Sequence, residues 1–163
     1  KLHYIIMIRN KLLSILLISL LLNSCGFKIV DKRKLVNFNI DQISTNGEKD
    51  VNFKLKNKLL LYVNKESSKI INVILDTKKN KTIKEKNIKN EITKYKIDII
   101  INVKLINVKS LKEFEFSSAR SGDYIVADKF SQTLNNEKKL IERLTEELSE
   151  IIFSEIIKKA NDF

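Results

Sequence analysis

The sequence of 163 residues contains no proline and no tryptophan, and only one cysteine, one histidine and three glycines. The histidine, His3, lies at the start, ahead of an apolar segment. The rest of the chain therefore lacks the usual general base, the usual nucleophile–base pairs and the ligands of nearly every zinc site. Three scattered glycines form no Gly-rich loop that could bind phosphate. We expect no enzyme activity, no metal and no cofactor.

The chain is strongly basic, with 31 Lys and Arg residues against 20 Asp and Glu residues. Lys outnumbers Arg by 27 to 4, and no basic motif interleaved with aromatic residues is present, so we expect no nucleic-acid partner. The segment from Lys65 to Lys96 contains ten lysines and four acidic residues, which gives it a net charge of +6. Lys, Ile and Asn are abundant together, so codon bias explains any single lysine equally well. The concentrated charge favours an anionic partner.

An apolar run near the N-terminus is typical of an export signal. Residues 12–22 are apolar except for two serines, and Arg9 and Lys11 precede them. At a helical rise of about 1.5 Å per residue the run covers about 16 Å, too short for the ~30 Å core of a bilayer. This pattern predicts a signal peptide over residues 1–24, with the natural chain beginning at Met7. The alternative interpretation of the run is a buried core helix.

The only cysteine follows this signal. Leu22, Asn23 and Ser24, which precede Cys25, resemble the lipobox of bacterial lipoproteins. That resemblance implies that Cys25 receives a diacylglyceryl group, that the signal is cut before it, and that the new amino group is acylated. Such acyl chains would hold the protein to a membrane. The alternative for Cys25 is a small buried core residue, because a disulfide within the chain has no second cysteine.

Cleavage before Cys25 leaves a lipidated tether, residues 25–34, and a single domain, residues 35–163. Apolar residues alternate along residues 36–41, 71–77, 95–105 and 114–118, which predicts four strands. Helical spacing of apolar residues predicts one helix after Gly47 and another over residues 137–159. The expected fold is α+β, in the order β-α-β-β-β-α. Two helices pack on one face of a four-stranded, mostly antiparallel sheet.

Local signals predict where the first elements end. Residues 44–47 should break the first strand, and Thr45 with Glu48 fits a capping box for the helix that follows. Residues 78–81 are rich in Lys and Asn, so a turn is expected there. Residues 82–92 are polar and show no clear periodicity. The alternative to a turn at residues 78–81 is that residues 82–92 extend the hairpin between the second and third strands.

Similar signals predict the boundaries in the second half. The alternation of apolar residues changes parity after Leu105, which predicts a β-bulge. Residues 121–123, Ser-Gly-Asp, predict a turn after the last strand. Asn135 is the expected N-cap of the final helix, whose apolar stripe includes Leu140, Leu144 and Leu148.

This layout resembles the lipopolysaccharide-assembly lipoprotein family, LptE. The likeness covers the signal, the lipobox with Cys25-Gly26-Phe27, and the order of strands and helices over the mature chain. Residues 94–99, KYKIDI, are similar to the central strand of the family, and so is the stretch from Tyr124 through Ala127, Phe130 and Asn136-Glu137 into the last helix. The chain departs from the family in having no proline and a shorter connection between the last two strands.

The resemblance implies a lipid-anchored protein on the periplasmic side of the outer membrane. Family members sit inside the barrel of the translocon LptD as a plug and assembly partner, and they bind lipopolysaccharide. Basic residues near the hairpin tip contact the glycolipid in relatives, and by position the candidates here are Lys84, Lys86 and Lys89. The stretch from Tyr124 to Phe130 is expected to form an interface or to pack, rather than to contact ligand.

Two alternatives from other classes remain open. One is a different small envelope lipoprotein that activates a peptidoglycan enzyme or serves as an accessory subunit of a transporter. The other is an anchored hydrolase that works through carboxylates alone. Copurification with an outer-membrane barrel would separate the first from an LptE-like role, and a pocket lined by close carboxylates would favour the second.

Overall fold

The computed structural model describes residues 36–61, 63 and 67–163, all within one compact unit, Lys32–Phe163. The predicted signal peptide, the tether and Cys25 lie outside the described residues. Six elements follow one another in the chain: β1 (Asn39–Gly47), α2 (Lys49–Leu61), β2 (Ile70–Lys86), β3 (Ile92–Asn107), β4 (Glu113–Ile125) and α3 (Phe130–Asn161). The predicted order β-α-β-β-β-α and the α+β class are confirmed.

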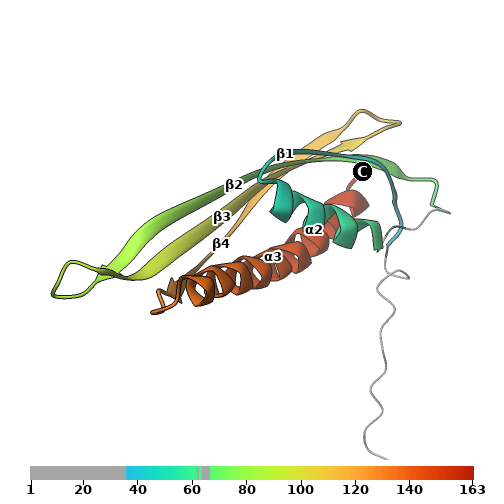
Figure 1. The fold of residues 1–163 in the computed structure, drawn as a ribbon. Helices are drawn as coiled ribbons and strands as arrows, with labels where there is room; N and C mark the ends of the chain where they lie inside the picture. Colours follow the sequence, from blue (N-terminus) through green and yellow to red (C-terminus); the bar gives the residue numbers. More distant parts are fainter. Residues whose placement is uncertain (1–35, 62, 64–66) are drawn as a thin grey trace, which may run out of the picture. The chain divides into compact units, whose positions relative to one another are not determined.

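The four strands form one mixed sheet in the order β1-β2-β3-β4. β1 pairs with β2 in parallel, because α2 carries the chain back between them, whereas β2, β3 and β4 form an antiparallel meander. Figure 1 shows both helices on the same side of this sheet, with α2 beneath β1 and β2 and α3 running under β3 and β4. The sheet and the helices therefore make two layers.

The core lies between these two layers. Alternate residues of the strands point toward the helices and are buried, as are the apolar stripes of α2 and α3. The most completely buried large side chains include Phe38, Leu55, Leu75, Ile99, Ile101, Leu144, Leu148 and Ile152. The period-2 and helical patterns of the sequence thus identify the core-facing residues.

The junction between β1 and α2 differs from the prediction. Residues 44–47 do not break the strand, because Thr45 pairs with Leu75 and Gly47 pairs with Thr77. Thr45 is therefore no helix cap. The chain turns at Gly47, whose φ of +88° lies in the left-handed region, and a Cβ there would come 1.9 Å from the carbonyl oxygen of Thr77. A glycine lets the chain leave the sheet at this point.

The hairpin of β2 and β3 is longer than the predicted strands. No turn occurs at residues 78–81, because Lys79 and Lys81 continue the ladder opposite Ile99 and Ile97. The alternative, in which residues 82–92 extend the hairpin, is correct. The bulge predicted after Leu105 is absent, since pairing with β2 runs evenly through Leu105 to residue 107, and the irregular register lies instead at residues 83–86.

The last strand and helix also extend further than predicted. Residues 121–123 are not a turn but pair with residues 96–98 of β3. α3 begins at Phe130, with Lys129 rather than Asn135 at its N-cap. The polar residues at its start lie within the helix and hold the connection from β4. The Thr133 hydroxyl accepts a hydrogen bond from the Ala127 amide (2.9 Å), and the Asn136 side chain donates to the Ile125 carbonyl (3.0 Å).

Candidate functional site

The end of the β2–β3 hairpin forms an arm that extends beyond the rest of the sheet. β1 ends where Gly47 pairs with Thr77, and β4 ends where Ile125 pairs with Lys94, whereas the β2–β3 ladder continues to Lys86 opposite Ile92. Figure 1 shows this arm projecting past the first turn of α3. The arm carries all three lysines predicted to contact a ligand.

Asn87 organises the turn at the tip of the arm. Its side-chain oxygen accepts hydrogen bonds from the amides of Lys89 (2.9 Å) and Glu91 (3.0 Å), and its side-chain nitrogen donates to the Glu91 carboxylate (2.7 Å). Its backbone amide also donates to the Glu91 carbonyl at 2.9 Å. Asn90 takes a φ of 63°, a conformation that Asn tolerates better than most residues. The tip is therefore a defined turn.

The three candidate lysines lie close together along this tip, but their surroundings differ. Lys84 forms an ion pair of 2.6 Å with Asp123 of β4. Lys86 donates a hydrogen bond of 2.9 Å to the side-chain oxygen of Asn90. Lys89 lies in the turn itself, and within the described part of the chain its ammonium has no acidic partner. Lys86 and Lys89 thus carry the charge most available to an anion.

An apolar residue stands between these two lysines. Ile88 is fully exposed, at 103 % of its reference surface, and Ile83 further down the arm is 51 % exposed. Glu85 is held by Lys94 at 2.5 Å, and the hydrogen bonds from Lys94 and Thr93 lower the pKa of its carboxyl. The tip therefore presents cations beside an exposed aliphatic side chain, a mixture suited to an amphipathic anion.

A second cluster, which the sequence did not reveal, ties the base of the arm to α3. Lys81 contacts Glu137 at 2.7 Å, and the Tyr124 hydroxyl donates to the same carboxylate oxygen at 2.8 Å. The Lys81 ammonium lies 4.5 Å from the centre of the Tyr95 ring, which stacks on Tyr124 with 5.6 Å between ring centres. We call these four residues the arm latch. They come from four separate elements, so no local motif predicts them.

The charges of the arm latch stabilise one another. Burial by itself raises the pKa of the Glu137 carboxyl, but the hydrogen bonds from Lys81 and Tyr124 outweigh burial and lower it. Burial likewise lowers the pKa of Lys81, yet Glu137 and Tyr124 raise it above its usual value. Burial, together with Glu137, raises the pKa of Tyr124. At neutral pH the cluster holds one cation and one anion beside a neutral phenol.

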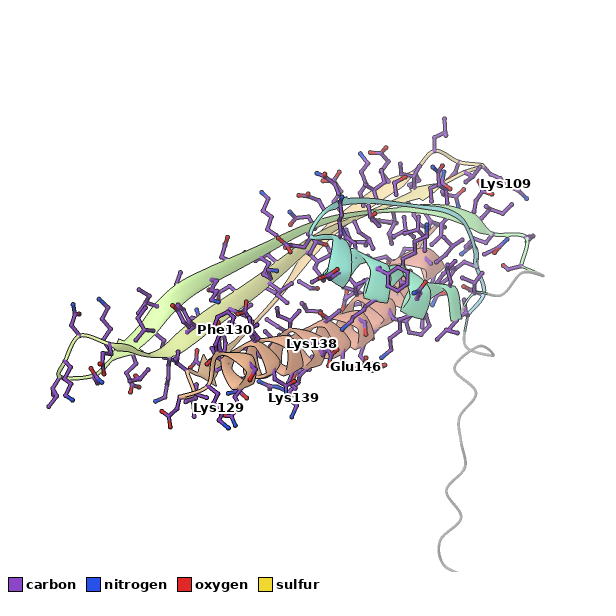
Figure 2. All side chains as sticks on the ribbon, viewed as in Figure 1. Lys109, Lys129, Phe130, Lys138, Lys139 and Glu146 are labelled. Carbon is purple, nitrogen blue, oxygen red and sulfur yellow. The ribbon has the colours of Figure 1, made fainter. Side chains whose placement is uncertain are left out.

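The stretch from Tyr124 to Phe130 is buried at one end and exposed at the other. Tyr124 is only 4 % exposed and packs in the core, and Phe130 at the first turn of α3 is 76 % exposed (Figure 2). Packing at Tyr124 and the exposure that an interface at Phe130 requires both agree with the prediction for this stretch. In the described ranges, neither helix is long and apolar enough to cross a membrane. Cys25 lies outside those ranges, so its lipidation stays a prediction.

The fold is shared with solved structures of bacterial proteins. Rare lipoprotein B from Shewanella oneidensis superposes with a TM-score of 0.58 at 9% sequence identity, covering 75% of this chain and 98% of that one. A lipoprotein candidate from Caulobacter crescentus gives a TM-score of 0.53 at 13% identity, covering 80% of this chain and 96% of its own. A candidate homologue of neuraminyllactose-binding hemagglutinin from Helicobacter pylori gives a TM-score of 0.51 at 11% identity, covering 84% of this chain and 91% of its own.

No protein-family description and no curated protein matches the sequence. At these low identities the structural likeness establishes the fold and leaves the activity to be argued from the residues. The chain has the fold of rare lipoprotein B.

Proposed function

We propose that this chain is an outer-membrane lipoprotein that assembles with and plugs an LptD-type translocon barrel and binds lipopolysaccharide during its delivery to the cell surface. Two independent features support the proposal. The fold is that of rare lipoprotein B, and the order of strands and helices resembles the LptE family. The sequence has the pattern of an export signal, followed by residues before Cys25 that resemble a lipobox. Gly26 stands where the lipoproteins it resembles have Asp when they are retained in the inner membrane.

The observation that carries the lipid-binding part is the tip of the arm. Lys86 and Lys89 flank the fully exposed Ile88 on a turn that Asn87 holds in place. A lipopolysaccharide molecule presents phosphates next to acyl chains, so a ligand of this kind can satisfy cations and an aliphatic side chain together. Hydrated lysine ammonium groups attract phosphate without a fixed geometry. Such contacts weaken as the salt concentration rises.

The lipid-binding part is tested by charge reversal at the tip. Each exposed contact contributes no more than ~1 kcal/mol, so single changes should have little effect. We expect the double variant Lys86→Glu/Lys89→Glu to weaken binding of purified lipopolysaccharide strongly and to reduce its salt dependence. This pair leaves the Lys84–Asp123 ion pair intact, whereas adding Lys84→Glu also places two carboxylates together. The triple variant should bind more weakly still.

A matched control separates the site from overall charge. Lys109 and Lys139 are exposed and lie away from the tip of the arm (Figure 2). Lys109→Glu/Lys139→Glu changes the net charge by the same amount as the tip variant. This control should bind lipopolysaccharide as the unaltered chain does, except for a small general effect at low salt. Equal loss in both variants, or none in either folded variant, would mean that the tip lysines reflect composition alone.

The barrel-assembly part has its own test. Full-length chain extracted from membranes should copurify with an outer-membrane barrel of the LptD type and should fractionate with the outer membrane. Recovery only from the inner membrane, or with a peptidoglycan enzyme or a transporter, would instead support one of the other envelope-lipoprotein roles.

A further inference from the structure

The sheet has a strand position that no segment of the described chain occupies. β1 lies beside β2 only as far as Gly47, opposite Thr77, where the Glu48 amide donates to the Thr77 carbonyl at 3.2 Å. Backbone groups of a strand alternate in direction, so those of Lys79, Lys81 and Ile83 face the same side as Thr77. Beside these residues β2 pairs only with β3. Their amides and carbonyls line an open edge on the path that β1 would follow.

An apolar groove lies on the helix side of this open edge. It is formed between the start of α2 and the first half of α3, has a volume of about 520 Å³ and is lined by Phe53, Leu134 and Ile141 among polar neighbours. Phe53 is 68 % exposed and Leu134 is 49 % exposed. Glu137, which also lines the groove, joins it to the edge through its ion pair with Lys81. Figure 1 shows that the first turns of α3 extend beyond the start of α2.

The charge of the edge selects what can bind there. Residues 78–86 contain five lysines and one glutamate. Lys79, Lys81 and Lys84 have acidic partners in the fold, whereas Lys78 and Lys86 contact no carboxylate within the described ranges. A second copy pairing through the same edge would place two lysine rows side by side, which like-charge repulsion disfavours. An acidic strand, in contrast, would be attracted.

The other open edge, along β4, lacks these features. α3 lies directly beneath β4, as the close approach of Leu140 to Gly122 and the Arg120–Glu147 contact of 3.8 Å indicate. A strand added beyond β4 would extend past α3, which already lies beneath β4. The two edges therefore give a direct comparison.

We propose that the open edge of β2 binds an extended segment of a partner protein, which adds a strand at the position that β1 vacates. Alternate apolar side chains of this segment fill the groove of Phe53, Leu134 and Ile141, and its acidic side chains lie on the other face near Lys78. The backbone groups of Lys79, Lys81 and Ile83 supply the hydrogen bonds. The inference does not depend on the proposed function, because the added strand pairs with the backbone of residues 79–83, whereas lipopolysaccharide binding uses the side chains of Lys86 and Lys89 at the tip.

The probe is a synthetic peptide, acetyl-Thr-Val-Glu-Val-Glu-Val-Thr-amide, added to the full-length lipidated chain in detergent. Hydrogen exchange should slow at the amides of residues 79–83 and not along β4. A peptide with lysines in place of its glutamates should bind more weakly. A peptide N-methylated at two adjacent central residues, so that each of its edges lacks a donor, should lose most of its affinity.

Two variants at one position isolate the backbone contribution. Lys79→Pro and Lys79→Ala both remove the lysine side chain and its contact with Glu48, but only the proline removes the outward amide. We expect Lys79→Pro to bind the probe about five-fold more weakly than Lys79→Ala, which corresponds to one hydrogen bond. Ser121→Pro, whose lost amide faces outward from β4, should leave binding unchanged.

Several results would overturn the proposal. One is unchanged hydrogen exchange at residues 79–83 when the peptide is added. Another is an N-methylated peptide that binds as tightly as the unmodified one. A third is loss of peptide binding in Ser121→Pro but not in Lys79→Pro. If Lys79→Pro fails to fold, the exchange measurement and the N-methylated peptide decide the question with the unaltered chain. Failure of these tests would leave the tip lysines and their lipopolysaccharide assay unaffected.

Discussion

Lys81 of β2 and Glu137 of α3 form an ion pair of 2.7 Å that ties the base of the arm to the helix layer. The carboxylate also accepts the Tyr124 hydroxyl, and both partners keep some contact with solvent, at 39 % and 20 % side-chain exposure. We expect Glu137→Gln to lower the free energy of unfolding at pH 7 by about 1–2 kcal/mol. Glu142→Gln on the same helix loses only the exposed pair with Lys54 and should change it by less than about 0.5 kcal/mol.

This contribution should depend on pH in a defined direction. The pKa of Glu137 is lower in the folded chain than its ordinary value of 4.5, so its stabilisation is present above that value and is lost as the pH falls through the folded pKa. The difference in unfolding free energy between Glu137→Gln and the unaltered chain should therefore shrink below about pH 4.5. Denaturant unfolding at pH 7 and pH 3 measures it. A difference that stays constant across this range would mean that the ion pair contributes nothing.

The buried pair of Asn52 and Thr77 gives a second prediction. The Thr77 hydroxyl donates to the Asn52 side-chain oxygen at 2.6 Å, while the Asn52 nitrogen donates to the Asn46 carbonyl at 2.9 Å. Thr77→Val should lower the free energy of unfolding by about 1–3 kcal/mol, because it leaves the buried side-chain oxygen of Asn52 without a hydrogen-bond donor. Asn52→Leu/Thr77→Val removes both polar groups and should recover part of that loss. Thermal unfolding of the unaltered chain, Thr77→Val and the double variant measures this. A double variant less stable than Thr77→Val would contradict the explanation.

The core and the order of elements could be predicted because they follow from periodicity along short stretches of sequence. Ile97, Ile99 and Ile101 alternate with Lys96, Asp98 and Asn102 except at Ile100, and Leu144 and Leu148 recur at helical spacing. Each pattern therefore identifies both the element and its buried face. Burial then requires the helices to cover one face of the sheet. These inferences need no knowledge of distant contacts.

The boundaries and the arm latch could not be predicted in this way. Residues 78–86 are polar apart from Ile83, which is typical of a loop. They are nevertheless in a strand, because they pair with β3, whose apolar residues alternate clearly from Tyr95 to Ile99. Ser-Gly-Asp at residues 121–123 is typical of a turn, yet Gly122 lies within β4 and lets α3 approach the strand. Lys81 and Glu137 are 56 positions apart, and only the fold brings them together.

Lipidation at Cys25 remains a prediction from the lipobox. We expect Cys25→Ser to leave the precursor uncleaved and without acyl chains, because the thiol is the group that receives the lipid. Asn23→Ala, at a loosely specified position of the lipobox, should be processed normally. Mass spectrometry of protein recovered from membranes distinguishes the two. A normally processed Cys25→Ser chain would be incompatible with a lipoprotein.

The contact between Gly122 of β4 and Leu140 of α3 gives the last prediction. A Cβ at Gly122 would lie 2.7 Å from a methyl carbon of Leu140 and 3.2 Å from the Arg143 guanidinium, so one of these side chains must move. We expect Gly122→Ala to lower the free energy of unfolding by about 1–3 kcal/mol through overpacking. Ser121→Ala, at the exposed neighbouring position, should change it by less than about 0.5 kcal/mol.

A double-mutant cycle tests whether this contact is the cause. Leu140→Ala alone should cost about 2–5 kcal/mol, because Leu140 is buried and its removal leaves a cavity. In Gly122→Ala/Leu140→Ala the new methyl group enters the space that the leucine vacated, so the two losses should be less than additive. Denaturant unfolding of the four proteins gives the coupling free energy. Full additivity would mean that the alanine at position 122 acts through the strand backbone and not through its contact with α3.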